Sequence, residues 1–424
     1  MHDHAESEAD ASVSHPSGFS RRSFIRAGAA AAGLSAVSFS TLGVSAPAFA
    51  AAGDPGTGSP AKLSDETPFG PVTVTDGGAS GASYARAVRL STAQPGRSRT
   101  LLATYQSFGG QAFPLFRSDD DGRTWTKQGS ILGPTAAPGL YVQPHLYELP
   151  RAFAGLPKGA LLFACNFWPF DVTGGFRIPS TNIQLYASTD AGVTWEFMST
   201  VAQGGPPDTT NGATPVWEPF LLLNKDRLIC YYSDQRDPNF GQKLAHQTST
   251  DLRTWGPVVD DATGTEYVQR PGMTTVAQLN ENLWIMTYEL GLPDNTYPVH
   301  YRIANDPEEF RFSEAVALVD QGGHAPNAAP VVTWSNSGST NGTLVVSDAD
   351  AQDFFVNRDL GAPDKWTRLS SPMPAGYSRF TVPLDSPGSW QRPGLVFVIT
   401  GPTFNDSFDP SKPHLIRAGV ISLD

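Results

Sequence analysis

The chain has 424 residues, among them 41 glycines, 36 prolines and only two cysteines, and it carries a formal net charge of −12. This charge argues against a nucleic-acid-binding protein, which would present a basic surface. The sequence has no run of eighteen or more strictly apolar residues, so we predict no membrane anchor. Abundant turn formers without a helical period favour an all-β fold.

The N-terminal segment is typical of an export signal. A twin-arginine motif, Ser20-Arg21-Arg22-Ser23-Phe24-Ile25-Arg26, precedes an alanine-rich apolar stretch and the small-residue site Ala48-Phe49-Ala50. We therefore predict a signal peptide over residues 1–50, a linker rich in Gly, Pro, Ser and Ala over 51–67, and a secreted mature protein. The folded domain is predicted to span residues 68–424.

An apolar strand pattern recurs six times in the predicted domain. The copies occupy residues 101–106, 161–166, 228–234, 283–289, 344–350 and 395–401, and each opens on Leu after a turn. Their starts lie about 51 to 67 residues apart, which suits one four-stranded unit. A second series precedes each copy, at residues 84–90, 142–149, 216–223, 270–279, 327–334 and 377–384. Six pairs in step predict a six-bladed β-propeller as a single domain.

Two turns fit the pattern Ser-x-Asp-x-Gly-x-Thr-Trp, known as the Asp-box. They occupy residues 118–125 and 188–195, and residues 249–255 form a shortened copy. The Asp carboxylate can accept backbone N–H groups in a tight turn, Gly can take a positive φ, and Trp can pack between sheets. We therefore interpret these aspartates as part of the scaffold and not as metal ligands or catalysts. The buried strands that hold Cys165 and Cys230 predict core thiols and no disulfide.

The propeller topology predicts where a site should form. Inner strands begin, and second strands end, at the same mouth of the ring, so side chains at those positions converge. The inner starts contribute Arg86, Gln143, His145, Glu218, Arg270, Asn327, Tyr377 and Arg379. The second-strand ends contribute Gln106, Asn166, Asp234, Glu289 and either Asp348 or Asp350.

Glu218 and Glu289 are the candidate catalytic pair at this mouth. They are expected on adjacent blades, and two carboxylates facing across a sugar ring are the usual glycosidase arrangement. The alternative is that each is a buried glutamate neutralised by Arg270 or Arg379.

Several segments together resemble glycoside hydrolase family 93. The similarity is dense from about residue 216 to 310 and rests on Cys230-Tyr-Tyr-Ser-Asp-Gln-Arg-Asp237, residues 241–260, Arg270-Pro-Gly-Met-Thr-Thr-Val-Ala277 and Met286-Thr-Tyr-Glu289. The resemblance implies a six-bladed propeller and an exo-α-L-1,5-arabinanase that releases arabinobiose from arabinan with retention. It also implies that Glu218 is the nucleophile, that Glu289 is the acid/base, and that Tyr377 supports the sugar.

The remaining predicted sugar-binding residues are weaker candidates. Gln143, His145, Tyr288, Asn327 and Arg86 complete the set, although His145 could equally be structural. Arg270 and Arg379 could bond sugar hydroxyls or hold the carboxylates, and Asp234 could simply pair with Arg236. The loop over residues 167–179 carries Trp168 and could either stack on sugars, blocking one end of the cleft, or pack its aromatics inward.

Two rival functions remain open at this stage. In a sialidase, Arg86, Arg270 and Arg379 would form a cluster that binds a carboxylate, and Tyr377 with Glu218 would form the nucleophile pair. Residues 84–87 lack the Phe/Tyr-Arg-Ile-Pro signature that sialidases show in their first blade. A lectin-like propeller would bind glycan without cleaving it. For the hydrolase we expect plant arabinan or arabino-oligosaccharide as the partner, no metal or organic cofactor, no nucleic acid and a monomeric state.

Overall fold

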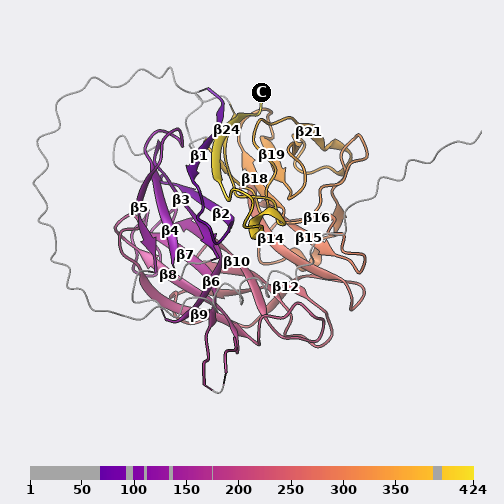
Figure 1. Ribbon diagram of the computed structural model, residues 1–424. Helices are drawn as coiled ribbons and strands as arrows, with labels where there is room; N and C mark the ends of the chain where they lie inside the picture. Colours follow the sequence, from indigo (N-terminus) through magenta and orange to yellow (C-terminus); the bar gives the residue numbers. More distant parts are fainter. Residues whose placement is uncertain (1–66, 92–98, 109–111, 133–136, 174, 385–393) are drawn as a thin grey trace, which may run out of the picture.

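Six four-stranded antiparallel sheets surround a central axis, as the sequence predicts for a β-propeller (Figure 1). The computed structural model describes residues 67–91, 99–108, 112–132, 137–173, 175–384 and 394–424. The predicted signal peptide, and the linker up to residue 66, fall outside the described residues. The colour sequence in Figure 1 runs round the ring, so that consecutive blades are neighbours in space.

Each of the first five blades is a meander of four consecutive strands. Blade 1 comprises β2 (Ala82–Arg89), β3 (Leu101–Ser107), β4 (Phe113–Ser118) and β5 (Thr126–Ile131). Blade 2 comprises β6 (Gly139–Glu148), β7 (Leu161–Pro169), β8 (Thr181–Ser188) and β9 (Glu196–Gly204), and blade 3 comprises β10 (Val216–Asn224), β11 (Arg227–Asp234), β12 (Lys243–Ser249) and β13 (Val259–Thr263). Blade 4 comprises β14 (Arg270–Asn280), β15 (Leu283–Gly291), β16 (Val299–Ala304) and β17 (Val316–Ala317), and blade 5 comprises β18 (Val331–Ser335), β19 (Thr343–Ser347), β20 (Phe354–Asn357) and β21 (Thr367–Leu369).

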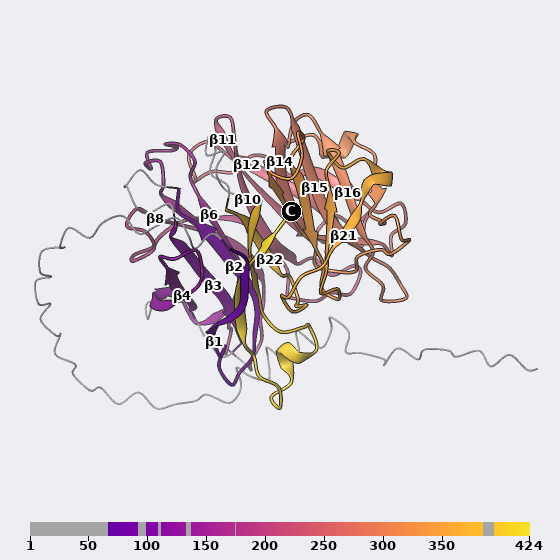
Figure 2. The ribbon, with the colours of Figure 1, turned by 90° about the horizontal axis from the view of Figure 1, so that it is seen from above.

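Blade 6 is built from both ends of the domain. Strands β22 (Phe380–Pro383), β23 (Leu395–Thr400) and β24 (Ile416–Ser422) are completed by β1 (Phe69–Thr75), which pairs antiparallel with β24. The first and last parts of the domain lie side by side in Figures 1 and 2 for this reason. Hydrogen bonds between these strands therefore close the ring.

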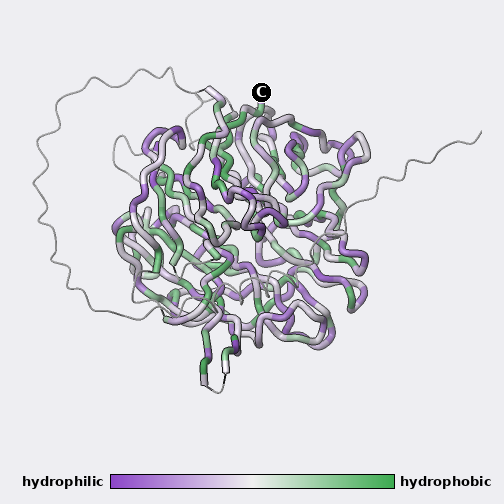
Figure 3. The backbone as a smooth tube through the Cα atoms, viewed as in Figure 1, coloured by the Kyte–Doolittle hydropathy of each residue, from purple (hydrophilic) through white to green (hydrophobic). Residues whose placement is uncertain are grey.

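The hydrophobic core is divided among the interfaces between blades. One cluster joins Leu185 of blade 2 to Leu221 of blade 3, and another joins Ile285 of blade 4 to Val346 of blade 5. Figure 3 shows apolar stretches along the strands and polar stretches on many connecting turns. A single hydrophobic core stops growing at a certain domain size. This domain can be larger, because each sheet packs only on its two neighbours. Cys165 and Cys230 lie buried in such clusters as free thiols, as predicted.

The Ser-x-Asp-x-Gly-x-Thr-Trp turns connect the third and fourth strands of their blades, at the end of the ring opposite the starts of the inner strands. In the first turn, Asp120 accepts hydrogen bonds from the Thr124 N–H (2.9 Å), the Thr124 hydroxyl (2.7 Å) and the Ser118 hydroxyl (2.7 Å). Trp125 Nε1 donates to the Gly122 carbonyl. Asp190 and Asp251 make the equivalent bonds in the other two turns. The aspartates are thus occupied in holding the turns.

Replacement of Asp120 by alanine is expected to destabilise the fold by about 1–2 kcal/mol through the lost hydrogen bonds. Burial opposes ionisation, yet the bonds from Thr124 and Ser118 hold the pKa of Asp120 below its ordinary value. The carboxylate therefore contributes stability above the unfolded pKa of about 3.9, and that contribution is lost as the pH falls through the lower folded pKa. Urea titration at pH 7 and at pH 3 should show a smaller difference between variant and wild type at pH 3. An equal difference at both pH values would contradict this role.

Candidate active site

A residue in the left-handed region of φ marks the start of every blade. Four lie in the inner strands themselves: Tyr84 (φ 47°), Gln143 (φ 56°), Glu218 (φ 61°) and Met273 (φ 54°). Ala329 (φ 46°) and Ser378 (φ 56°) precede β18 and β22. In the four strands the ladder register shifts at the same point, which is the geometry of a β-bulge. Such strained positions cluster at functional sites.

The pairing register aligns these bulges with the ends of the second strands. The residue just before each bulge residue pairs with Gln106 in blade 1, Asn166 in blade 2, Ser233 in blade 3 and Glu289 in blade 4. Glu289 is thus the blade-4 counterpart of Ser233, and Glu218 is the blade-3 counterpart of Gln143. Two sets of equivalent positions therefore surround the mouth of the ring.

Glu218 is held by donors from four directions. Its Oε2 accepts hydrogen bonds from the Ser233 hydroxyl (2.9 Å) and the Met273 N–H (3.0 Å). Its Oε1 lies 3.4 Å from the Tyr84 hydroxyl and 3.5 Å from Gln143 Nε2. The Glu218 N–H in turn donates to Gln143 Oε1 at 3.1 Å. This half-buried carboxylate therefore has a fixed orientation at the mouth.

Glu289 lies fully buried beside it. Its Oε2 accepts the Ala329 N–H at 2.8 Å. A methyl group built on Gly272 would lie 3.4 Å from Glu289 Oε1 and 3.5 Å from Ser233 Oγ, the hydroxyl that bonds Glu218. Both glutamates thus lie around Gly272 at the same end of the ring.

Aromatic side chains from blades 6 and 1 form the opposite wall of the site. Tyr84 and Tyr377 pack edge to face with ring centroids 5.3 Å apart, and their hydroxyls lie 3.5 Å apart. The Tyr377 hydroxyl also lies 3.2 Å from Met273 Sδ. Tyr377, predicted to support a sugar, is thus linked to Glu218 through Tyr84.

A second layer of side chains plugs the channel beneath the site. It consists of residues two positions after the bulges, including Arg86, His145, Phe220 and Phe380. Arg86 is buried against the Phe380 ring and donates to the Ser378 carbonyl and hydroxyl. Burial lowers the pKa of Arg86 to about 10, and the electrostatic interactions with Tyr84 and Glu218 oppose this shift. His145 accepts the Leu221 N–H at 3.1 Å, and burial together with the Arg86 charge lowers the pKa of His145 to about 3. His145 is therefore neutral at pH 7.

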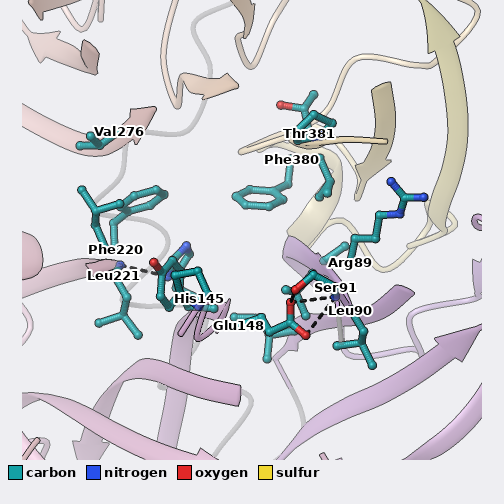
Figure 4. A pocket seen from close by; sticks show the side chains of 18 of the residues that line it. Arg89, Leu90, Ser91, His145, Glu148, Phe220, Leu221, Val276, Phe380 and Thr381 are labelled. Atoms are coloured by element: carbon teal, nitrogen blue, oxygen red, sulfur yellow. Dashed lines mark hydrogen bonds between the residues drawn. The ribbon is translucent and has the colours of Figure 1, made fainter. Parts of the chain in front are cut away.

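A cavity of about 660 Å³ opens on the far side of this plug. Figure 4 shows His145 with Phe220 and Phe380 inside it, and Glu148 bonded to Ser91. The ends of inner strands line this cavity, whereas Glu218 lies near the start of an inner strand and Glu289 near the end of a second strand, both at the mouth. The plug thus separates it from the two carboxylates.

The chain aligns over most of its length with two solved fungal enzymes. One is a family 93 α-L-arabinofuranosidase of Fusarium graminearum in complex with arabinobiose: it shares 36% sequence identity and a TM-score of 0.75, over 84% of this chain and 98% of that enzyme. The other is an α-L-arabinanase of Penicillium chrysogenum, also complexed with arabinobiose: it shares 34% identity and a TM-score of 0.75, over 84% and 99%.

The chain belongs to glycoside hydrolase family 93. It is accordingly a glycoside hydrolase, as predicted. No protein-family model and no curated protein sequence matches it. A sialidase of Streptococcus pneumoniae aligns at 11% identity with a TM-score of 0.54, over 86% of this chain and 71% of that one, which shows a shared fold alone.

Three residues predicted to bind substrate in this family 93 protein face away from the mouth. Asp234 is buried and paired with Arg236 at 2.8 Å, because the strand alternation directs its neighbour Ser233 to the site instead. Tyr288 stacks on His300 in the core for the same reason. Arg379 is fully buried, donates to the carbonyls of Gln352 and Asp353, and lies over the Phe354 ring. The positions of these three side chains therefore do not support the prediction that they bind substrate.

Two further predicted residues, Arg270 and Trp168, do not reach the mouth but contact residues that pack next to Glu218. Arg270 donates to Gln235 and Gln242, and Gln235 also accepts from Trp217, the neighbour of Glu218. Trp168 is buried edge to face on Trp217 and so packs inward, while Phe176 of the same loop is 49% exposed.

Asn327 shapes the turn before Ala329. Its Oδ1 accepts the Tyr297 N–H, and its Nδ2 donates to Asp350. Arg86 and His145 belong to the plug described above. Of the twelve predicted residues, the mouth itself thus brings together Glu218, Glu289, Gln143 and Tyr377.

Four residues that the sequence analysis did not select also form the mouth of this family 93 enzyme: Tyr84, Ser233, Gly272 and Met273. Aligning the blades by the pairing register, and not by the ends of the apolar runs, identifies Ser233 and Met273 as counterparts of Glu289 and Glu218. Within the described ranges, no three His, Cys, Asp or Glu side chains are grouped to hold a metal ion. No helix in those ranges is long and apolar enough to cross a membrane.

Proposed function

We propose that this chain is a secreted exo-acting hydrolase that cleaves α-1,5-L-arabinofuranosyl linkages of arabinan with retention and releases arabinobiose. The observation that carries the proposal is the position of Glu218 and Glu289 on adjacent blades around Gly272. The fungal relatives that were solved with arabinobiose support the choice of substrate.

In the proposed mechanism, one carboxylate attacks the anomeric carbon while the other protonates the leaving oxygen. The second then removes a proton from the water that releases the sugar from its covalent ester. The Ser233 hydroxyl and the Met273 N–H hold Glu218 in place, and the Ala329 N–H holds Glu289. Fixed hydrogen bonds of this kind keep the reacting groups in position for attack.

Incubation with debranched arabinan tests the proposal directly. We expect arabinobiose as the first soluble product, identified by mass spectrometry, and an initially α-configured anomeric centre by NMR. A ladder of larger oligosaccharides at early times would contradict the exo action, and an initially β-configured product would contradict retention.

Arg86→Met is expected to shift the acidic limb of the pH–rate profile to higher pH. The buried Arg86 cation interacts electrostatically with Glu218 and the tyrosines, and a nearby cation favours the ionised carboxylate. We expect kcat/KM at pH 5 to fall by about tenfold, with a smaller effect at pH 7. Thermal melting checks that the variant folds. A parallel loss at all pH values would indicate a purely structural role.

The three arginines that a sialidase would use to bind a carboxylate do not form a cluster here. Arg86, Arg270 and Arg379 bond to different partners, and Arg379 is fully buried under backbone carbonyls. Sialoside hydrolysis at a rate comparable to that on arabinan would revive the sialidase alternative.

We further propose export through the twin-arginine route and a monomeric mature protein. The motif at Arg21 and Arg22, with the apolar and small-residue stretches after it, supports the export. Fractionation of a producing culture tests the location, and sedimentation tests the monomer.

A further inference from the structure

A second cavity, of about 600 Å³, lies on the side of the ring between blades 1 and 2. Its volume falls within the range of about 300–1,000 Å³ typical of ligand sites. It extends from Val193, Thr194 and Trp195, in the turn before β9, to Tyr141 near the start of β6. Since that turn and the inner-strand start lie at opposite ends of the blades, the cavity runs along the flank toward the mouth. We name it the flank groove.

Ten of the described residues line the flank groove, and none of these ten is charged. Four of the ten are aromatic: Tyr141, Tyr186, Trp195 and Phe197. The uncharged lining excludes recognition of an ionic ligand and suits a neutral one with both apolar faces and hydroxyl groups.

Two aromatic side chains are presented toward solvent at the groove. Phe197 is 47% exposed and packs edge to face on Tyr186, with ring centroids 5.4 Å apart. Trp195 is half-buried: its Nε1 donates to the Gly192 carbonyl and its ring packs edge to face on Phe163, which leaves part of the side chain at the groove. An aromatic ring provides the apolar surface on which the C–H face of a sugar packs.

A polar group lies within the same lining. Gln184 Oε1 accepts the Tyr186 hydroxyl at 2.6 Å, which fixes the orientation of the amide. Gln184 Nε2 donates to no residue within the described ranges, and the side chain is half-buried. It is therefore available to donate to a ligand hydroxyl.

Tyr141, near the start of β6, forms the mouth-side end of the flank groove. Tyr141 also lines a small cavity together with Gln106 and Trp168. Gln106 accepts the N–H of Gln143, whose amide lies 3.5 Å from Glu218. The mouth-side end of the flank groove therefore lies at the same end of the ring as Glu218.

We propose that the flank groove binds a stretch of the neutral polysaccharide substrate away from the catalytic centre. The proposal rests on the proposed function for the identity of the polymer. The groove increases the affinity for long chains and takes no part in bond cleavage. Short substrates do not reach it, so they do not depend on it.

Kinetics of Phe197→Ala and Gln184→Ala test the proposal. We expect the KM for arabinan to rise by about tenfold in Phe197→Ala, as for the loss of one aromatic contact, and by a few-fold in Gln184→Ala. The kcat and KM for arabinotriose should stay unchanged in both. Phe312→Ala is the matched control, since Phe312 is 71% exposed and lies on blade 4.

Affinity electrophoresis provides the binding readout without turnover. In a Glu289→Gln background, arabinan in the gel should retard the protein, and Phe197→Ala should remove most of the retardation. An unchanged KM for arabinan together with unchanged retardation would overturn the groove proposal. Failure of the proposed function is distinct, because the wild-type protein would then release no arabino-oligosaccharide.

Discussion

Glu218→Gln and Glu289→Gln are each expected to lower kcat on arabinan by about 10³- to 10⁴-fold, which is the effect of losing an acid/base or nucleophilic carboxylate. In the proposed mechanism, either change removes one of the two groups that the double displacement requires. The amide keeps an oxygen that can accept the Ala329 N–H at Glu289 or the Met273 N–H at Glu218, so the fold should survive. Initial rates of product release, with thermal melting alongside, measure the effect.

Azide distinguishes the roles of the two glutamates. The acid/base variant should still cleave an aryl arabinofuranoside with a good leaving group and yield a glycosyl azide of retained configuration. The nucleophile variant should yield the inverted azide. Glu266→Gln is the control, because Glu266 is an exposed carboxylate outside the site. Residual activity above about a tenth of wild type in either variant would remove that residue from the mechanism.

Gly272→Ala is expected to lower kcat by about 10²-fold without unfolding the protein, because small displacements of reacting groups carry penalties of this size. The new methyl group would lie 2.7 Å from Gln242 Nε2 and at contact distance from Glu289 Oε1 and Ser233 Oγ. Gln242 is buried and bonded to Pro271 and Arg270, so it has little room to withdraw. The methyl group is therefore expected to shift Glu289 directly and Glu218 through the Ser233 hydroxyl.

Gly129→Ala is the matched control for that variant. A methyl group at Gly129 would meet no atom within 4 Å. Steady-state kinetics on arabinotriose should show a loss for Gly272→Ala alone. If both variants behaved as wild type, the space around Gly272 would not position the glutamates.

The fold could be predicted because its signal repeats. A single segment such as residues 228–234 is ambiguous between helix and strand, whereas six such segments in step with six partners are not. The structure has a strand within each of the twelve predicted segments, although β18 and β22 begin only at Val331 and Phe380, after the predicted starts at Asn327 and Tyr377. The closing strand β1 left no such signal, because its sequence, Phe-Gly-Pro-Val-Thr-Val-Thr, repeats nowhere in phase with the blades.

The site was predicted less completely because its positions depend on register. Topology alone predicts the position of Glu218, Glu289, Gln143 and Tyr377 at the mouth, because it brings strand ends to one end of the ring. The sequence predicts Asp234 at the mouth in place of Ser233, because it does not fix the register and a shift of one residue turns a side chain to the other face of the sheet. The sequence pattern does not reveal the bulges that place Tyr84 and Met273, since positive φ at such residues is set by tertiary structure.

The pairing of β1 with β24 makes the two extremities of the domain interdependent. During synthesis β1 has no partner until β24 has left the ribosome. The ring of blades can therefore close only when synthesis of the domain is nearly complete. Trimming either extremity damages the same sheet, and with it the β22 edge that carries Tyr377 and Ser378 toward the carboxylates. The proposed activity thereby depends on an intact β1–β24 pairing, which lies on a different blade from both proposed catalytic glutamates.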